Sequence, residues 1–416
     1  MSTSSRPPSR AANLLLVSGI VAVAISGCGG GTVTASASVA AVPSATITAS
    51  LSVTASAKPI PPPSPSPRPN GVFSTTGSMI DFRAYGATST LLVDGRVLVT
   101  GGTNGYIAPG SLSSAEIYDP ATGKWTKTGS MAGAHYGQTA TLLKDGRVLV
   151  VSGCGAHTAA EIYDPPTGKF TLLGKVAVQG MCDSTATRLL DGRVLLVGGD
   201  DYKSGAVSSL AELFDPGTGK FTRTGSLHTA RSYAQAALLP DGRVLVVGGA
   251  KSTNTPNEVD FDSAEIYDPA TGKFSETAKM ETPRTNFSAT LLASGKVLVA
   301  GGEYIGAGGD GLLDSAELYD PATGQFSPTG SMTAGRSSAS GVDWGSMYTG
   351  LLADGRVLFA GGGAHKPTAE IYDPATGKFS ATTSPPTDKS PYGIPAVTLK
   401  DGRVLIPGAP SLIYTP

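Results

Sequence analysis

Seven copies of one motif, spaced by about fifty residues, predict an all-β fold, a seven-bladed β-propeller of four-stranded blades. The most regular part of the motif has the sequence DGRVL, or SGKVL in the fifth copy. It begins at Asp94, Asp145, Asp191, Asp241, Ser294, Asp354 and Asp401. Successive copies are separated by 51, 46, 50, 53, 60 and 47 residues. A glycine pair and two aromatic residues recur in most copies, so we expect each copy to form one blade.

The first copy shows why four strands are expected. Asp94–Gly95 lies between two β-prone runs, and Asp-Gly is typical of a two-residue hairpin turn in which both residues have φ > 0. The run from Asp119 to Gly123, with the sequence DPATG, combines a side chain that hydrogen-bonds the backbone, a fixed φ and a glycine for a left-handed position. The four expected strands are residues 88–92, 96–99, 115–118 and 124–128.

These features resemble the kelch family. The glycine pair occurs at Gly101–Gly102, Gly198–Gly199, Gly248–Gly249, Gly301–Gly302 and Gly361–Gly362, and the second copy has Ser152–Gly153 instead. Six residues separate Tyr118 from Trp125, which is similar to the family's spacing, and Phe replaces Trp in later copies. The resemblance extends from about Asn70 to the C-terminus and implies a propeller.

The two ends of this region complement each other. Residues 72–76 match the end of a motif, whereas the last copy stops after a third strand at residues 411–415. We expect these two segments to pair and close the ring, which leaves no open sheet edge. The alternative is six blades with a remnant outside the propeller.

The N-terminus has the features of an export signal. Two arginines precede an apolar run from Leu14 to Ile25, which is short for a membrane span. The run ends in ISGC, which resembles the bacterial lipobox, and this resemblance implies that Cys28 carries a lipid after cleavage. The alternative is an ordinary signal peptide. We therefore expect residues 1–28 to be a lipoprotein signal peptide and the protein to be anchored on the extracytoplasmic side of a bacterial membrane.

Residues 29–70 are rich in Ala, Ser, Thr and Pro and contain few large apolar residues, which predicts a disordered stalk before a propeller at 71–416. The chain beyond residue 70 has a formal net charge of −5. We expect no nucleic-acid binding, which would need clustered positive charge. The closed edges and the low charge favour a monomer whose only membrane contact is the lipid.

Strand direction places the loops between second and third strands, and the connections between blades, on one face. These segments differ among copies, and varied loops on a rigid frame often bind ligands. We call this the varied face. The ligand-binding candidates expected there are Arg83, Tyr85, His135, Tyr136, Arg231, Tyr233, Arg284, Trp344 and Tyr392. The alternative is that the arginines pair with acids and hold the blades together.

Groups that recur in every blade are expected to be structural. Arg96 opens a second strand and Asp119 closes the third, so we expect a cross-strand pair there and in the other copies. The recurring glutamates, such as Glu116, receive the same interpretation. Cys154 and Cys182 fall on the varied face of neighbouring blades, and in an exported protein we expect them to form a disulfide. Copper ligation and two unbridged thiols are the alternatives.

The motifs of common enzymes are missing from the sequence, and we expect neither a metal nor a cofactor. Galactose oxidase resembles this chain in its propeller, but that family uses a crosslinked tyrosine, a second tyrosine and two histidines. Only His135, His157, His228 and His365 occur here, without the family's Tyr-His pair. Asp260 and Asp262 are far short of a calcium loop.

The sequence therefore favours a binding platform for an envelope protein or a glycan, with catalysis less favoured. The alternative is a periplasmic or cell-surface enzyme acting on sugars, similar to sialic-acid mutarotases or galactose oxidase. Fold alone does not decide between them.

Overall fold

The structure is a computed structural model. It describes residues 71–105, 110–151, 153–154, 159–174, 176, 182–201, 204–251, 259–304, 311–338, 346–363, 368–386 and 393–416. All of these belong to one compact unit, residues 66–416. The predicted signal peptide with Cys28, and the predicted stalk, lie outside the described residues. No helix in the described part is long and apolar enough to cross a membrane.

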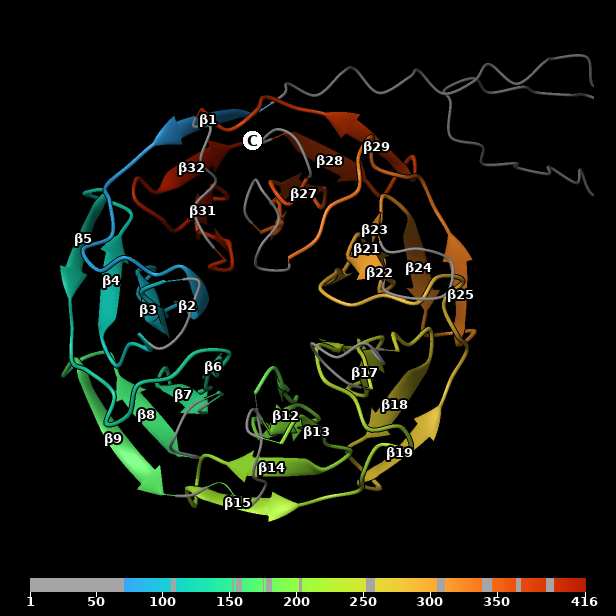
Figure 1. The fold of residues 1–416 in the computed structure, drawn as a ribbon, viewed down its shortest axis with the longest axis horizontal. Helices are drawn as coiled ribbons and strands as arrows, with labels where there is room; N and C mark the ends of the chain where they lie inside the picture. Colours follow the sequence, from blue (N-terminus) through green and yellow to red (C-terminus); the bar gives the residue numbers. More distant parts are fainter. Residues whose placement is uncertain are drawn as a thin grey trace, which may run out of the picture. The chain divides into compact units, whose positions relative to one another are not determined.

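Seven four-stranded antiparallel sheets form a ring around a central axis (Figure 1). Blades 1 and 2 are β2 (Tyr85–Leu91), β3 (Val97–Thr103), β4 (Ala115–Asp119), β5 (Lys124–Lys127), and β6 (Thr139–Leu142), β7 (Val148–Val151), β8 (Ala160–Asp164), β9 (Lys169–Gly174). Blades 3 and 4 are β10 (Thr185–Arg188), β11 (Val194–Val197), β14 (Ala211–Asp215), β15 (Lys220–Arg223), and β16 (Gln235–Leu238), β17 (Val244–Val247), β18 (Ala264–Asp268), β19 (Lys273–Glu276). Blades 5 and 6 are β20 (Ser288–Leu291), β21 (Val297–Ala300), β24 (Ala316–Asp320), β25 (Gln325–Pro328), and β26 (Tyr348–Leu351), β27 (Val357–Ala360), β28 (Ala369–Asp373), β29 (Lys378–Ala381). Blade 7 is β30 (Val397–Thr398), β31 (Val404–Ile406), β32 (Leu412–Thr415) and β1 (Val72–Thr75).

The ring closes as the sequence predicts. β1 pairs antiparallel with β32, from Val72 opposite Thr415 to Thr75 opposite Leu412. Blade 7 is thus assembled from both ends of the propeller region, and this confirms seven blades. With β1 in place, blade 7 has its fourth strand and the edge of β32 is covered, so closure removes the unpaired end that an open repeat would leave.

The DGR turn differs from its prediction. Leu92 N donates to Arg96 O at 2.8 Å, which makes a three-residue loop, and of the three residues only Gly95 has a positive φ (94°). The Asp94 carboxylate instead accepts a bond from Arg96 N at 3.0 Å. A three-residue loop with glycine in the left-handed position matches the right-handed strand twist as well as the expected turn would.

The recurring aromatic pair holds neighbouring blades together. The Tyr118 and Trp125 rings pack with centroids 5.1 Å apart, and equivalent pairs occur in the other blades. The Tyr118 hydroxyl also bonds Thr76 Oγ1, at the end of the preceding blade's outer strand, at 2.8 Å. The tyrosine therefore buries its ring in its own blade, and its hydroxyl bonds the preceding blade.

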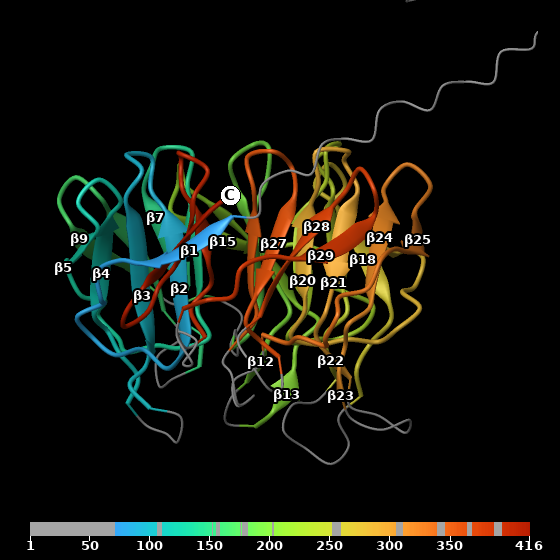
Figure 2. The ribbon, with the colours of Figure 1, turned by 90° about the horizontal axis from the view of Figure 1, so that it is seen from above.

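The two faces of the ring differ (Figure 2). The regular hairpin turns gather on one face, which we call the turn face. Two short ribbons, β12–β13 (Asp200–Asp201 with Ala206–Val207) and β22–β23 (Glu303–Tyr304 with Gly311–Leu312), project from the opposite, varied face. These ribbons grow from the loops between second and third strands in blades 3 and 5.

Candidate functional site at the channel mouth

Backbone hydrogen bonds link adjacent blades on the varied face, where each first strand is about to begin. Gly137 N donates to Gly86 O at 2.9 Å, Asp183 N to Gly137 O at 3.2 Å, and Tyr233 N to Asp183 O at 3.2 Å. The equivalent positions of blades 1 to 4 are therefore linked one to the next around the channel mouth. Ser338 N donates to Asn286 O at 2.8 Å in the same way between blades 5 and 6.

The residues in these links adopt the left-handed conformation. Blades 1, 2 and 7 use glycine there: Gly86, Gly137 and Gly393 have φ of 66°, 59° and 51°. Blades 3, 4 and 5 use Asp183, Tyr233 and Asn286, with φ of 52°, 53° and 51°. They are the non-glycine residues with positive φ in the described part of the chain. A tyrosine in this conformation is unfavourable, and such residues cluster at functional sites.

The side chains at this place form a cluster of tyrosines around one acid. Tyr233 hydrogen-bonds both Asp183 and Tyr85. The Tyr85 and Tyr136 rings lie 6.1 Å apart. All four side chains are partly exposed. We call Tyr85, Tyr136, Asp183 and Tyr233 the mouth cluster. It offers hydroxyls and aromatic surface around one carboxyl group, which suits a polar ligand.

The acid of the cluster has an altered protonation. Burial, and then the nearby Asp200 carboxylate, raise the pKa of Asp183 to about 7, although the Tyr233 hydroxyl opposes this. The Asp183 charge in turn raises the pKa of Tyr85, and burial raises that of Tyr233. Asp183 therefore changes its charge near neutral pH, while both tyrosines keep their protons.

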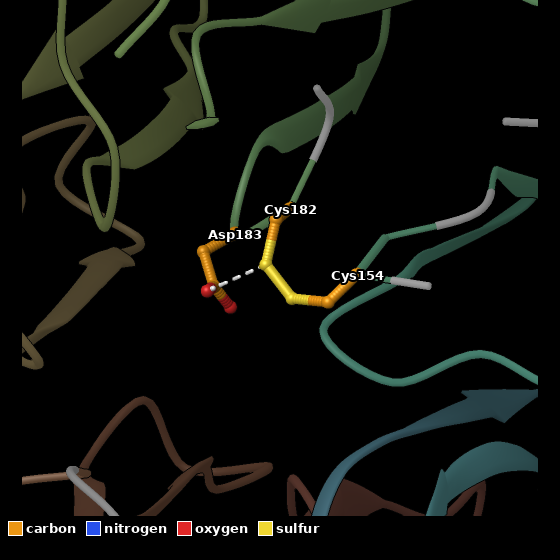
Figure 3. Close-up of side chains that lie close together, drawn as sticks. All are labelled: Cys154, Cys182 and Asp183. Carbon is orange, nitrogen blue, oxygen red and sulfur yellow. Dashed lines mark hydrogen bonds between the residues drawn. A yellow bond between two sulfur atoms is a disulfide. The ribbon is translucent and has the colours of Figure 1, made fainter. Parts of the chain in front are cut away.

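A disulfide lies beside Asp183 (Figure 3), and it confirms the predicted pair. Cys154 and Cys182 are bridged with a Cα–Cα distance of 4.6 Å, and Cys182 Sγ lies 3.3 Å from Asp183 Oδ2. Cys154 N bonds Tyr136 O at 2.8 Å within blade 2. The bridge thus fastens blade 2 to blade 3 where the mouth cluster stands.

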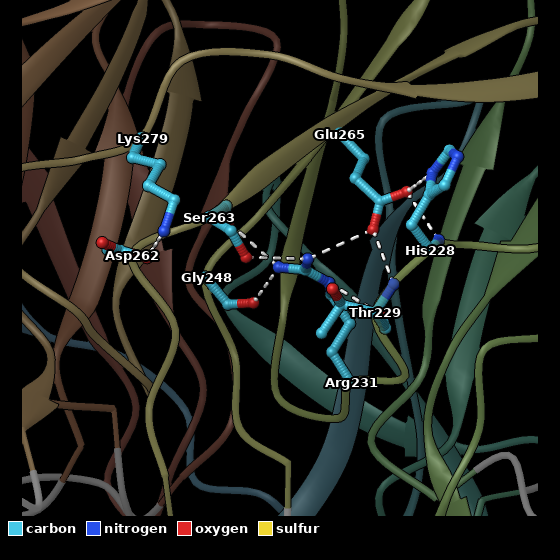
Figure 4. A network of polar contacts seen from close by, with 8 residues as sticks. All are labelled: His228, Thr229, Arg231, Gly248, Asp262, Ser263, Glu265 and Lys279. Atoms are coloured by element: carbon cyan, nitrogen blue, oxygen red, sulfur yellow. Dashed lines mark hydrogen bonds and ion pairs between the residues drawn. The ribbon is translucent and has the colours of Figure 1, made fainter.

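The predicted ligand-binding arginines occupy a different place. The side chains of Arg83, Arg231 and Arg284 have no exposed surface. Figure 4 shows Arg231, whose Nη1 donates to Gly248 O at 2.8 Å and Ser263 O at 3.0 Å, and whose Nη2 lies 3.2 Å from Glu265 Oε1. A guanidinium so fully bonded inside the protein is not available to a ligand. The alternative interpretation, an arginine that holds the blade together, describes what is seen.

A second role of the glutamate explains why it recurs on the third strand of each blade except blade 7. Glu265 also accepts bonds from the backbone N–H groups of His228 and Thr229, at 2.9 and 3.1 Å. It therefore caps the incoming connection as well as pairing with Arg231. The sequence prediction missed a fourth such arginine, Arg336, which pairs with Glu370 at 2.8 Å. Its place in the sequence was the available signal, because Arg336 follows Thr333, whose N–H group Glu370 caps, just as Arg231 follows the capped residues His228 and Thr229.

The DGR arginines were expected to pair across strands with the YDP aspartates, and this prediction was wrong for the arginines. Arg96 pairs with Asp94 of its own turn at 2.7 Å, and the other DGR copies do the same. Asp119 instead accepts a bond from Ala121 N at 2.9 Å in its own turn. The cross-strand pair forms where lysine replaces arginine, between Lys296 and Asp320 at 3.1 Å.

The remaining candidates divide between buried and undescribed positions. His135 is buried, with 1% exposure, and its backbone carbonyl accepts a bond from Gly102 N as Arg231's does from Gly199 N. His135 therefore stands at the arginine position of blade 2. Trp344 and Tyr392 lie outside the described residues. Asn286, which is not among the predicted candidates, donates to Glu303 at 2.6 Å beside the mouth.

In the described part of the chain, one group of three His, Cys, Asp or Glu side chains has its ligand atoms close together: Cys154, Cys182 and Asp183. The disulfide removes both sulfurs as ligands. The Nδ1 atom of His228 contacts Glu265 at 2.9 Å, in a structural glutamate cap. His157 and His365 lie outside the described residues.

Comparison with known proteins agrees with this architecture. Residues 86–132 match the family model for the Kelch motif. The chain is similar to spermatocyte protein spe-26 of Caenorhabditis elegans, with 31% identity over 27% of this chain, and to Kelch-like protein 41a of Danio rerio, with 29% identity over 34%. These matches span 19% and 22% of the two relatives. Together with the seven blades, they identify the chain as a kelch-repeat β-propeller.

Two solved structures share the fold. One is a fungal alcohol oxidase of the AA5 family in complex with copper, with a TM-score of 0.64 and 19% identity, covering 84% of this chain and 77% of that one. The other is YjhT, with a TM-score of 0.56 and 14% identity, covering 74% of this chain and 99% of that one. At such identities the likeness concerns the fold alone.

Proposed function

We propose that this chain is an exported propeller, anchored to a bacterial membrane by a lipid on Cys28, that binds an envelope partner through its varied face. The partner is a protein or a glycan. The observation that carries the proposal is the row of non-glycine left-handed residues at Asp183, Tyr233 and Asn286. Glycine adopts the same backbone conformation in other blades without strain. The strained residues are therefore explained by a function of their side chains.

The arrangement of polar groups supports a binding role. The arginines are buried and paired with glutamates. The mouth cluster presents tyrosine hydroxyls and rings from blades 1, 2 and 4 around Asp183 of blade 3. Tyrosine provides large contact area with little loss of side-chain entropy, which favours its use at binding surfaces. Similarity to kelch-like relatives supports an interaction role in general terms.

Site-specific photocrosslinking in living cells tests the binding face. A photoreactive amino acid replaces Val259, which is 50% exposed on the varied face, or Val93, which is 60% exposed on the turn face. We expect adducts from position 259 and not from position 93. Mass spectrometry of the adduct distinguishes a protein from a glycan. Adducts from position 93 alone would contradict the proposal.

The anchor has its own test. Cys28→Ala removes the expected lipid attachment site, and we expect the protein to move from the membrane fraction to a soluble extracytoplasmic fraction. Metabolic labelling with a fatty acid should mark the wild-type chain and not the variant. A variant that stays membrane-bound and unlabelled like the wild type would exclude lipidation without affecting the proposed binding face.

A further inference from the structure

The axial channel contains a pocket of about 330 Å³ beside blades 5 to 7. Its wall is made by β20, β26, the segment 393–396 that precedes β30, and Gln235 at the start of β16. Pockets that hold small molecules have volumes of roughly 300–1,000 Å³. The channel is therefore wide enough here for one small ligand, and the rigid first strands of several blades preform the site.

Polar side chains with unused hydrogen-bonding capacity line this pocket. Within the described part of the chain, the side chains of Gln235, Ser346 and Thr349 form no hydrogen bond to protein, and Ser288 bonds Thr290 at 3.3 Å. By contrast, Thr398 Oγ1, which does not line the pocket, donates to Leu351 O at 2.8 Å between blades 7 and 6. The Thr398 hydroxyl, which links two blades, is thus distinct from the hydroxyls that face the pocket. The second group is available to a ligand.

The part of the pocket wall that the structure describes carries no charge. None of the described lining residues is Asp, Glu, Lys, Arg or His. A charged ligand would lose its hydration there without gaining an opposite charge, which is costly. Apolar surface from Ile394, Pro395 and Ala396 lies beside the hydroxyls. A ligand with several hydroxyl groups and C–H faces fits both parts of this wall.

The pocket adjoins the acidic mouth. Gly393, at one end of the pocket, packs against Ala84 and Tyr85 of the mouth region. At another place Ser338 N bonds the carbonyl of Asn286, whose side chain holds Glu303. When they are ionised, the Asp183 and Glu303 carboxyl groups near this end of the channel repel anions. The approach and the wall therefore favour the same chemistry, a neutral molecule.

We infer that the channel pocket is a binding site for a neutral monosaccharide unit, either as a small molecule or as the end of a glycan chain. The site is separate from the partner-binding face proposed above, and each can fail without the other. Ser288, Thr290 and Thr349 supply hydroxyl contacts, and Gln235 supplies an amide that can both donate and accept.

Saturation-transfer NMR with the full-length chain measures this binding directly. The probes are the methyl glycosides of glucose, galactose and mannose. The anionic control is glucuronate, which carries a carboxylate at C6 of the glucose ring. We expect transfer to at least one neutral glycoside and none to glucuronate. Maltotriose and the corresponding trisaccharides of the other sugars then distinguish a chain end, which shows transfer to the terminal unit, from a small molecule, which binds better alone.

Two variants place the site. Thr349→Val keeps the side-chain shape and removes one hydroxyl, and we expect it to weaken binding by about two- to tenfold. Thr349→Phe fills the pocket and should abolish binding. Thr126→Val, the same change on the outer strand β5, is the matched control and should bind like the wild type. Thermal unfolding of each variant shows whether it has folded.

The inference is overturned by any of three results. These are no transfer to any neutral glycoside, equal transfer to glucuronate, or unchanged binding in folded Thr349→Val and Thr349→Phe variants. Sugars at high concentration stabilise most proteins through exclusion from the surface, so a rise in melting temperature shared by all variants does not count as binding. Loss of binding restricted to the Thr349 variants supports the site.

Discussion

Blades 4 and 5 differ from blades 2 and 3 in how the segment before the first strand is held. In blades 4 and 5 a buried arginine, Arg231 or Arg284, pairs with the glutamate of the third strand. In blade 2 the glutamate is kept as Glu161, but His135 stands at the arginine position. Blades 2 and 3 are instead joined by the Cys154–Cys182 disulfide.

The difference shows that the two devices act on different contacts. The arginine bonds within its own blade, whereas the disulfide crosses from one blade to the next. Glu161 accepts bonds from Ala132 N at 3.0 Å, and burial without a cationic partner raises its pKa. Blade 7 needs no cationic partner, because Leu412 occupies the glutamate's position in the strand register.

The largest expected effect comes from breaking an arginine pair. Arg284→Met leaves Glu317 buried without its partner, and we expect a loss of about 3–5 kcal/mol in the free energy of unfolding. Urea denaturation measures it. The double variant Arg284→Met, Glu317→Leu imitates the uncharged arrangement of blade 7 and should recover much of the loss. A double variant no more stable than the single one would contradict the idea that the uncompensated charge is the cause.

Removing the disulfide should cost somewhat less. Cys154→Ser with Cys182→Ser opens a link between residues 28 apart in the sequence, and we expect a loss of about 3 kcal/mol. Reduction of the wild type should reproduce the loss, and the double variant should not respond to reductant. Hydrogen exchange should increase first in blades 2 and 3. A uniform increase around the ring would show that the bridge stabilises no particular pair of blades.

The acid beside the disulfide should give a pH-dependent effect of intermediate size. The pKa of Asp183 is raised to about 7 in the folded protein, so the folded state holds this proton more tightly than the unfolded state does. Its contribution to stability is therefore complete below about pH 4 and is lost as the pH rises through about 7. Asp183→Asn should remove this loss, which is roughly 1–4 kcal/mol.

Unfolding free energies of wild type and Asp183→Asn, measured from pH 4 to pH 8, check this prediction. The difference between the two curves isolates Asp183 from Glu161 and Glu303, whose pKa values burial also raises. Parallel curves would mean that the Asp183 carboxyl is ionised throughout, and that its tyrosine contact outweighs burial.

The smallest effect should come from the surface pairs. Arg243 and Asp241 are 39% and 46% exposed, and Arg243→Gln should change stability by less than about 1 kcal/mol. The same urea measurement gives a direct comparison with Arg284. Similar losses for the two variants would show that burial is not what separates the two classes of arginine.

Much of the fold was predictable because its signals are local. The Asp-Gly and DPATG turns and the Tyr–Trp spacing each lie within a few residues of the structure they specify. The spare strand at residues 72–76 was recognisable because it repeats the end of a motif, although its partner lies at the other end of the chain. The cysteine pair was predictable from compartment and from its place on neighbouring blades. Even so, the DGR turn has a three-residue loop, because Asp94 caps Arg96 N instead of adopting a positive φ.

The mouth was only partly predictable from the residues that precede each first strand. Tyr85, Tyr136 and Tyr233 were named, and the structure brings them to Asp183. The arginines beside them were assigned to the same surface because Arg231 and Tyr233 are two residues apart. In the extended segment that enters the strand, however, Arg231 turns inward to Glu265, and Tyr233 adopts a left-handed conformation at the mouth.

The sequence by itself was enough to predict the number of blades, the closure of the ring, the two faces and the disulfide partners. These predictions follow from the repeat period, strand direction, turn chemistry and the positions of the cysteines in the repeat, all of which can be read along the chain. Only the tertiary structure decided which polar residues are buried and which stand at the mouth. A guanidinium enters the interior where a carboxylate and carbonyl oxygens from distant strands meet it, and these groups come together only once the blade has formed.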